Sequence, residues 1–511
     1  MKRVIIIGGG ITGLAAAYKI LEHVRDSGKQ LDLTVLEAGS RFGGIIQTHE
    51  RGGFLLESGP DSFISEKPEA LNLSKRLGLE SRLIETNENH RRSFIVRQGR
   101  LLPVPAGFHL LAPSRFWPFV KSDIFSWTGK ARMALDLLLP RRNLNGDPAE
   151  HDATADESLA QFVRRRLGRE ALERMAQPMI GGIYTADPEQ LSLRATMPRF
   201  LEMERAHGSV IRALRKQARR PEDEGTEIDA ATNGVRYSLF LSFDRGMQLL
   251  TDKLEQKIRD FNSQVANSQS QISADGGVTR VTMQLNTAVQ SLAFEPREPA
   301  GSKWKLRTGN NEVHFADAIC LALPAYVSAS LLNDIDRELA SKLNGISYAS
   351  SATINLAFKR ENIPHPLDGF GFVVPFIEGR SLIACTFSSV KFSGRAPDGY
   401  VLLRVFMGGA LQPEMFELSS EELISRARVD LRELLGVEQP PLFAEVAKWE
   451  RSMPQYHLGH LQRVERIKAR LPSLPGLALA GNAYSGLGIP DCIRSGEAAA
   501  QFIIDSLHGA E

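Results

Sequence analysis

The sequence predicts an α/β protein in which the first and last parts of the chain build one domain. Residues 4–21 read as a strand, a glycine-rich turn and an apolar helix, and the same order recurs at residues 477–496. Between them, residues 352–407 show the alternation of several antiparallel strands. A length of 511 residues exceeds what one simple core holds, so we expect two or three lobes.

The opening strand, residues 4–7, turns into the first helix through a Gly-x-Gly-x-x-Gly motif. Its first glycine permits a tight turn, the second lets the backbone approach a pyrophosphate, and the third lets the helix pack on the strand. Phosphates would then lie at the helix N-terminus. A purely structural glycine turn is the alternative. The predicted contacts are Gly8, Gly10, Ile11, Thr12 and Gly13.

The next strand, residues 33–36, ends in Glu37, whose carboxylate is placed to accept both hydroxyls of an adenosine ribose. An acid there disfavours a ribose 2′-phosphate, so the predicted cofactor is FAD or NAD. Arg41 then precedes Gly43 and Gly44, which offer a cation and backbone N–H groups to a diphosphate. An ordinary turn with a surface arginine is the alternative. These residues favour FAD.

Composition excludes several classes of protein. Lys and Arg number 62 and Asp and Glu 60, so no global field points to nucleic acid. Three cysteines without paired spacing suit a reducing compartment. We expect no cleavable signal, because glycines interrupt the first apolar run, and no stretch reaches the roughly 18 apolar residues of a membrane span. A cytoplasmic protein, either soluble or peripheral on a membrane, is expected.

Residues 38–44 and 52–60 extend the glycine-rich pattern after the ribose-binding acid. With the opening motif they resemble the FAD-dependent amine oxidase and protoporphyrinogen oxidase superfamily. Further motifs in order then resemble the porphyrinogen oxidases of haem synthesis, and this resemblance covers essentially the whole chain. These motifs are Gly182-Ile183-Tyr184 and residues 369–375, 454–460 and 486–496.

The resemblance implies a discontinuous Rossmann-type FAD-binding domain with an antiparallel-sheet substrate lobe and a mostly helical lobe. It also implies noncovalent FAD and the six-electron oxidation of a porphyrinogen to a porphyrin by molecular oxygen. No metal is expected, since His457 and His460 lack companions at ligand spacing. The predicted FAD-binding segments are 1–85, 235–323 and 446–511, with the helical lobe at 90–210 and the substrate lobe at 325–445.

By resemblance, the carbonyl region of Gly182 faces the pyrrole N–H groups, and a basic residue holds a propionate. The strands within residues 352–407 are expected to form a sheet with one apolar aromatic face, made by Phe370, Phe372, Val373, Phe387 and Phe406. Of these, Phe370, Val373 and Phe406 line the macrocycle by resemblance. Arg92 is the predicted anchor, with Arg97 as its alternative. The remaining residues expected beside FAD are Gly59, Pro60, Val289, Trp449, Gly481, Leu487, Gly488 and Ile489.

The substrate is less firmly specified than the cofactor. Protoporphyrinogen-specific members often carry an arginine where this chain has Ser93. Coproporphyrinogen III is therefore slightly preferred, and protoporphyrinogen IX is the alternative. An amine oxidase, a carotenoid desaturase and a noncatalytic porphyrin carrier also remain open, as does a homo-oligomer.

Residues 108–132 interleave aromatic and basic side chains in an otherwise aromatic-poor chain. A patch that lies on a membrane surface has this composition, because rings reside at headgroup level and lysines reach phosphates. Burial within a helical lobe gives the same pattern. The sequence leaves both interpretations open.

Overall fold

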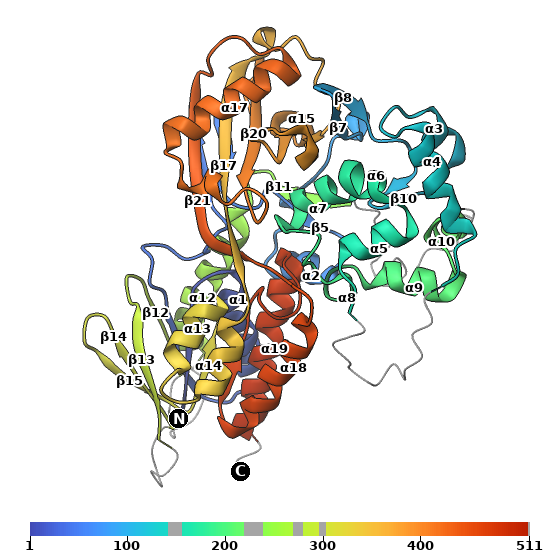
Figure 1. The fold of residues 1–511 in the computed structure, drawn as a ribbon. Helices are drawn as coiled ribbons and strands as arrows, with labels where there is room; N and C mark the ends of the chain where they lie inside the picture. The colour runs from blue at the N-terminus through green and yellow to red at the C-terminus, as the bar shows by residue number, and fades with distance from the viewer. Residues whose placement is uncertain (142–155, 219–238, 269–278, 296–302, 509–511) are drawn as a thin grey trace.

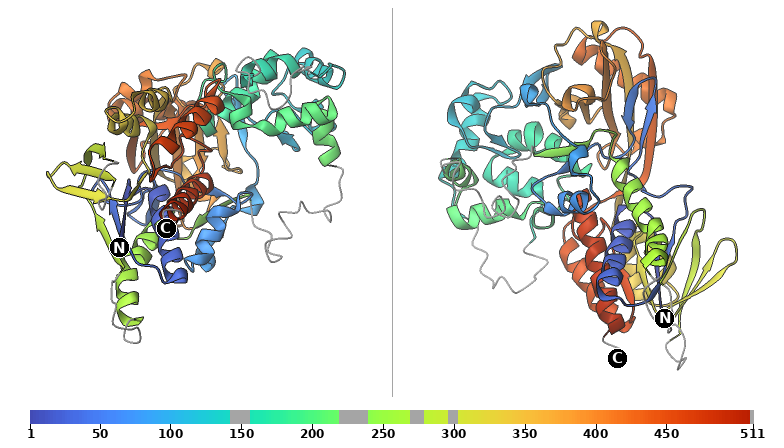
Figure 2. Two further views of the ribbon diagram at one scale, coloured as in Figure 1. Left: turned by 90° about the horizontal axis from the view of Figure 1, so that it is seen from below. Right: turned by 180° about the vertical axis from the view of Figure 1, so that it is seen from behind.

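The computed structural model describes residues 1–141, 156–218, 239–268, 279–295 and 303–508. Figure 1 shows a lower region that contains both termini, an upper region built on a long-stranded sheet, and a helical lobe at one side. Both views of Figure 2 keep the helical lobe, cyan to green, to the side of the two sheets. The domain boundaries given above stay predictions.

The lower region is built on a five-stranded parallel sheet in the order β12-β2-β1-β16-β22. Parallel strands covered on both faces need apolar side chains, and Val4, Ile5, Ile6 and Ile7 are all buried. The strands come from widely separated stretches, which confirms the predicted discontinuous α/β domain. Their bounds are β1 (Lys2–Ile7), β2 (Leu31–Leu36), β12 (Arg280–Gln284), β16 (Ala318–Leu321) and β22 (Leu477–Leu479).

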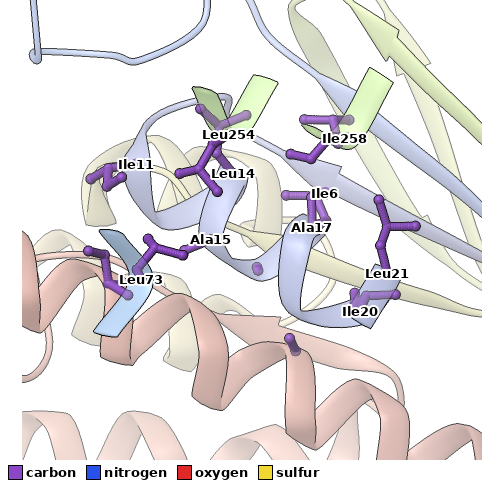
Figure 3. Close-up of a cluster of buried hydrophobic side chains, with 14 of the residues drawn as sticks. Ile6, Ile11, Leu14, Ala15, Ala17, Ile20, Leu21, Leu73, Leu254 and Ile258 are labelled. Atoms are coloured by element: carbon purple, nitrogen blue, oxygen red, sulfur yellow. The ribbon is translucent and has the colours of Figure 1, made fainter. Parts of the chain in front are cut away.

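Three helices pack on one face of this sheet: α1 (Ile11–Ser27), α12 (Gln248–Ser268) and α19 (Ile489–His508). Figure 3 shows Leu254 and Ile258 of α12 beside Leu14 and Ala17 of α1. On its other side α1 meets α19 so closely that a Cβ on Gly496 would lie 2.2 Å from the Thr12 carbonyl oxygen. This contact brings the two ends of the chain together.

The upper region is a seven-stranded sheet in the order β21-β17-β20-β19-β18-β7-β8, antiparallel except for β18 and β7. Helix α17 (Ser420–Leu435) covers one face. The hairpin β7–β8, which lies within the range predicted for the helical lobe, pairs with β18. Bounds are β7 (Phe94–Arg97), β8 (Arg100–Pro103), β17 (Tyr348–Lys359), β18 (Gly371–Val373), β19 (Ala384–Phe387), β20 (Tyr400–Gly408) and β21 (Phe443–Pro454).

The sequence predicted one aromatic face for this sheet, and that prediction is wrong. Successive side chains of a strand point to opposite faces. Phe372 and Phe387 are buried on the α17 face, whereas Val373 and Phe406 share the opposite face through the pairs Val373–Ala384 and Ala384–Phe406. Phe370 precedes β18 and is half-buried. The α17 face is thus a core, and only the other face is available for a ligand.

The helical lobe has its own apolar core and a fully buried ion pair between Arg166 and Asp136. Its helices include α3 (Phe116–Lys121), α4 (Trp127–Ala134), α5 (Leu159–Arg166), α7 (Gln177–Tyr184), α9 (Pro198–His207) and α10 (Val210–Gln217). A π-helical turn, η5 (Leu172–Ala176), leads into α7. Within the described ranges, no helix is long and apolar enough to cross a membrane.

Candidate active site

The turn between β1 and α1 assigns different tasks to its glycines. A Cβ on Gly13 would lie 1.9 Å from the Gly8 carbonyl oxygen, so helix and strand can approach only because this position is glycine. A Cβ on Gly10 would meet nothing closer than the Gly44 Cα, at 4.0 Å. Gly10 is also the N-cap of α1, without a side-chain cap. Open space therefore lies over free helix N–H groups, which suits an anion.

Glu37 lies at the carboxyl end of β2 and faces this turn. One carboxylate oxygen accepts the Gly9 N–H at 2.7 Å and the other accepts the Gly39 N–H at 2.7 Å. Each oxygen retains a lone pair for a further donor, such as a ribose hydroxyl. The Glu37 carbonyl accepts the Thr287 N–H at 2.8 Å, which places the start of β13, Val289, close to the same site.

The Arg41 guanidinium holds the second glycine loop in shape. It donates to the carbonyls of Phe42 at 2.9 Å, Gly44 at 2.5 Å and Ile46 at 3.0 Å. The Gly43 N–H in turn donates to the Gly9 carbonyl at 2.8 Å, so the second loop lies against the first. Arg41 thus contributes to the site by ordering the loop around Gly43 and Gly44, in addition to its charge.

The stretch that follows β4 (Phe54–Glu57) is fastened to the upper sheet by its carbonyl groups. The Ser58 carbonyl accepts the Thr353 hydroxyl at 2.8 Å and the Trp449 indole N–H at 2.9 Å. The Asn355 amide donates to the Glu57 carbonyl at 3.0 Å. These bonds fix the predicted flavin-lining segment against β17 and β21.

The next residues of this stretch meet buried charges. Arg404, buried in β20, donates to the Gly59 carbonyl, and a Cβ on Gly59 would lie 1.7 Å from the Ile45 carbonyl oxygen. Beyond Pro60, Asp61 pairs with Lys391 at 3.0 Å. Burial opposes ionisation of Asp61, but Lys391 and Arg404 hold its pKa below the usual range. The segment therefore ends in a largely buried ion pair.

The C-terminal loop, residues 481–489, is the last segment predicted to contact FAD. The Gly481 N–H donates to the Ser495 hydroxyl at 3.0 Å, and the Gly488 N–H donates to Asp491 at 3.3 Å. Asp491 also pairs with Lys67 at 2.6 Å. Leu487 packs against the core of the helical lobe, and Ile489 begins α19. The loop 481–489 thus lies where the lower region meets the helical lobe.

A row of side chains on the open face of the upper sheet runs from the flavin-lining segment to α7. Val373, Ala384, Phe406 and Thr353 pair directly across neighbouring strands, and Thr353 is the residue that bonds the flavin-lining segment. At the other end of the row, a Cβ on Gly182 would lie 3.7 Å from Val373. Gly182 is exposed near the C-terminus of α7, and none of the described residues donates to its carbonyl.

The two candidate arginines lie in different settings. Arg92 pairs with Asp368 at 3.2 Å, and its side chain is 52% exposed. Arg97 lies on the same face of β7 as Ile95, which contacts the helical-lobe core, and its buried Nε has no partner within the described chain. The Arg92 assignment stays a prediction, and the structure gives Arg97 the less compensated charge.

Comparison with known proteins agrees with this geometry. The profile of the flavin containing amine oxidoreductase family matches residues 11–504. The chain belongs to this family. It is 33% identical to the coproporphyrinogen III oxidase of Bacillus subtilis (strain 168) over 98% of this chain and 97% of that one. Identity to the chloroplastic protoporphyrinogen oxidase of Nicotiana tabacum is 28%, over 96% of this chain and 83% of that one.

A crystal structure from Exiguobacterium sp. 255-15, described as that of a candidate protoporphyrinogen oxidase, superposes with a TM-score of 0.80 at 29% identity. The match covers 99% of each chain. The flavoprotein is thus an oxidoreductase, and FAD is its cofactor. The residues present fit this cofactor, because the space over Gly10, the free N–H groups of α1 and the Glu37 lone pairs suit an adenosine diphosphate.

Sequence reasoning missed the side chains that hold the flavin-lining segment. Thr353 and Asn355 interrupt the apolar strand β17 at alternate positions, and Arg404 is the one charged residue of β20. Polar side chains that share one face of a buried strand need partners there. That pattern was the available signal. It could not identify the partners, which lie about 300 residues away in the chain.

We expect alanine at Gly10 and at Gly13 to fail in different ways. Gly10→Ala should fold with a thermal midpoint near that of the parent but carry little FAD, because its Cβ enters the space left for the diphosphate. Gly13→Ala should lower the stability of the apoprotein by roughly 1–3 kcal/mol, because the contact with Gly8 forces β1 and α1 apart. Thermal unfolding and flavin absorbance after gel filtration measure both effects. Full FAD occupancy in Gly10→Ala would contradict the assignment, and Lys29→Ala, at an exposed position beyond α1, is the control for handling losses.

Proposed function

We propose that the flavoprotein oxidises coproporphyrinogen III to coproporphyrin III, with molecular oxygen as the electron acceptor. The observation that carries this proposal is the row from Thr353 to Val373, which leads from the flavin-lining segment to the free carbonyl of Gly182. A flat apolar substrate fits along such a row. The similarity to a coproporphyrinogen III oxidase over nearly the whole chain supports the same substrate class.

This reaction mainly requires the protein to hold the substrate in the correct position. FAD, held at Gly10 and Glu37, would supply the acceptor for a hydride from a meso carbon, and oxygen would take the electrons with hydrogen peroxide as the product. Gly182 accepts a hydrogen bond from the pyrrole N–H groups, while Val373 and Phe406 pack against the macrocycle and exclude water. Holding the reacting groups in place supplies much of the rate, so a strong protein base is unnecessary.

Protoporphyrinogen IX is the second candidate, because relatives of that name also match nearly the full chain. Ser93 occupies the position at which protoporphyrinogen-specific members often carry arginine. It is uncharged and lies just before β7. Coproporphyrinogen has four propionates and protoporphyrinogen two. Arg92 and Arg97 lie just before and within β7, the strand that pairs with β18, and two cations there support the substrate with more carboxylates.

Oxygen uptake with each substrate decides between the candidates. The purified yellow protein should consume oxygen with coproporphyrinogen III and produce porphyrin fluorescence at a kcat/KM at least about tenfold above that with protoporphyrinogen IX. A preference in the opposite direction would restore protoporphyrinogen IX. No uptake with either, from a protein that holds FAD, would overturn the porphyrinogen assignment. The autoxidation rate of each substrate without protein is the blank.

Enlarging residue 182 should affect turnover and leave the cofactor in place. Gly182→Ala adds a Cβ at an ordinary contact distance from Val373, so its turnover should stay within about threefold of the parent. Gly182→Leu fills the space in front of the carbonyl and should lower kcat/KM by about a hundredfold at unchanged FAD content. Turnover of the leucine variant equal to that of the alanine variant would refute the role of Gly182.

We also propose that the helical lobe contacts a membrane surface through the start of α3 and the start of α4. Trp117 and Trp127 are 69% and 72% exposed and Leu138 is 81% exposed, whereas Phe119 and Phe125 are buried. Burial thus accounts for only part of the aromatic stretch. Exposed Arg115 and Lys121 flank α3, which suits anionic headgroups.

Sedimentation with vesicles tests this surface. The protein should sediment with phosphatidylglycerol vesicles and less with neutral phosphatidylcholine vesicles, and the double variant W117S/W127S should weaken binding about tenfold. Phe315→Ser, which removes a 43% exposed ring from a distant strand, is the matched control. Equal binding of the double variant and the control would refute the proposed surface.

A further inference from the structure

One short segment meets all three regions of the molecule. It is residues 455–460, which connect β21 to α18 (His460–Arg470). The Tyr456 carbonyl accepts the Ser192 N–H of the helical lobe at 2.8 Å, and the Gly459 N–H donates to Asp156 of that lobe at 3.0 Å. A change in this segment would therefore reach the sheet, the helical lobe and the lower region together.

The Tyr456 hydroxyl holds the C-terminal loop at two points. It donates to the Asn482 carbonyl at 2.6 Å and accepts the Gly486 N–H at 2.7 Å. Both bonds are shielded from water, because Tyr456 is 3% exposed. The loop continues directly into residues 487–489, which are predicted to lie along the flavin. One hydroxyl thus holds residues 482 and 486, which are the two ends of the stretch that leads into residues 487–489.

His460 braces the Tyr456 ring from behind. The two rings are stacked with centroids 3.9 Å apart and an interplanar angle of 11°. His460 is fully buried, and neither ring nitrogen has a hydrogen-bond partner in the part of the chain that the structure describes. Burial lowers the pKa of His460 to about 4, so the ring is neutral at physiological pH. A neutral imidazole without hydrogen bonds contributes its flat shape.

We propose that Tyr456, braced by His460, is a positioning residue that sets the height of residues 487–489 against the flavin. The inference rests on the proposed placement of the flavin beside this loop, and it goes beyond the substrate assignment. Tyr456 itself is buried in the protein. Its effect passes through the two backbone bonds to Asn482 and Gly486. Small displacements of a cofactor-lining loop change reaction geometry, and about 1 Å can cost a hundredfold in rate.

Tyr456→Phe removes only the hydroxyl and is the direct test. In the FAD-loaded protein we expect the flavin absorption bands and the midpoint potential to shift, with kcat lowered about tenfold and KM nearly unchanged. Tyr484→Phe is the matched control, because it also removes a buried hydroxyl from this loop. Within the described residues, the Tyr484 hydroxyl makes no hydrogen bond to the loop backbone. A spectrum, potential and kcat for Tyr456→Phe equal to those of the control would overturn the proposal.

A pair of substitutions at His460 keeps the test decisive if Tyr456→Phe fails to fold. His460→Phe preserves the stack and removes two unpaired nitrogens. Its flavin spectrum should match that of the parent, and its stability should be equal or higher. His460→Ala removes the brace and should shift the spectrum in the direction expected for Tyr456→Phe. Identical spectra for the two His460 variants would overturn the proposal. These readouts need no porphyrinogen, so a failure of the substrate assignment is distinguishable from a failure here.

Discussion

The relative position of the two sheets depends on the hydrogen bonds that hold residues 57–59 between them. This stretch belongs to the lower region by sequence, yet its carbonyls accept donors from β17, β20 and β21 of the upper sheet. Backbone carbonyls that are buried need donors, and here side chains supply them in place of a ladder. The same stretch is the predicted wall of the flavin site. One set of hydrogen bonds therefore positions the predicted flavin site against the upper sheet.

Charged side chains also lie at the junction between residues 57–61 and the upper sheet. Burial raises the pKa of Glu57 to about 7, whereas Asp61 is held ionised by Lys391 and Arg404. A buried ion pair gains little over apolar packing, but removal of one partner costs about 3–5 kcal/mol. Arg404 donates to the Gly59 carbonyl and also interacts electrostatically with Asp61, so one side chain of β20 acts on two residues of this stretch.

Local patterns predicted the elements whose cause is local. The strand, glycine turn and helix at residues 4–21 depend on neighbours in sequence, and the parallel sheet followed from repeating that pattern at the C-terminus. The prediction of one aromatic face was wrong because Phe372 and Val373 are adjacent in a strand, so their side chains point to opposite faces. The pairing of Arg92 with Asp368 and the role of Arg404 were beyond reach, since their partners are set by the tertiary fold and not by spacing.

The helix that presents Gly182 shows how backbone constraint creates chemistry. Pro178 has no N–H to donate within α7, and the chain before it widens into a π-turn in which the Gln177 N–H bonds the Leu172 carbonyl. The helix then ends within two turns, so the Gly182 carbonyl lies at its negative end, and no described residue donates to it. Loss of a hydride leaves positive charge on a porphyrinogen. In the proposed reaction, a helix C-terminus and the Gly182 carbonyl beside the pyrrole N–H groups would stabilise that charge as it develops, without any residue that titrates.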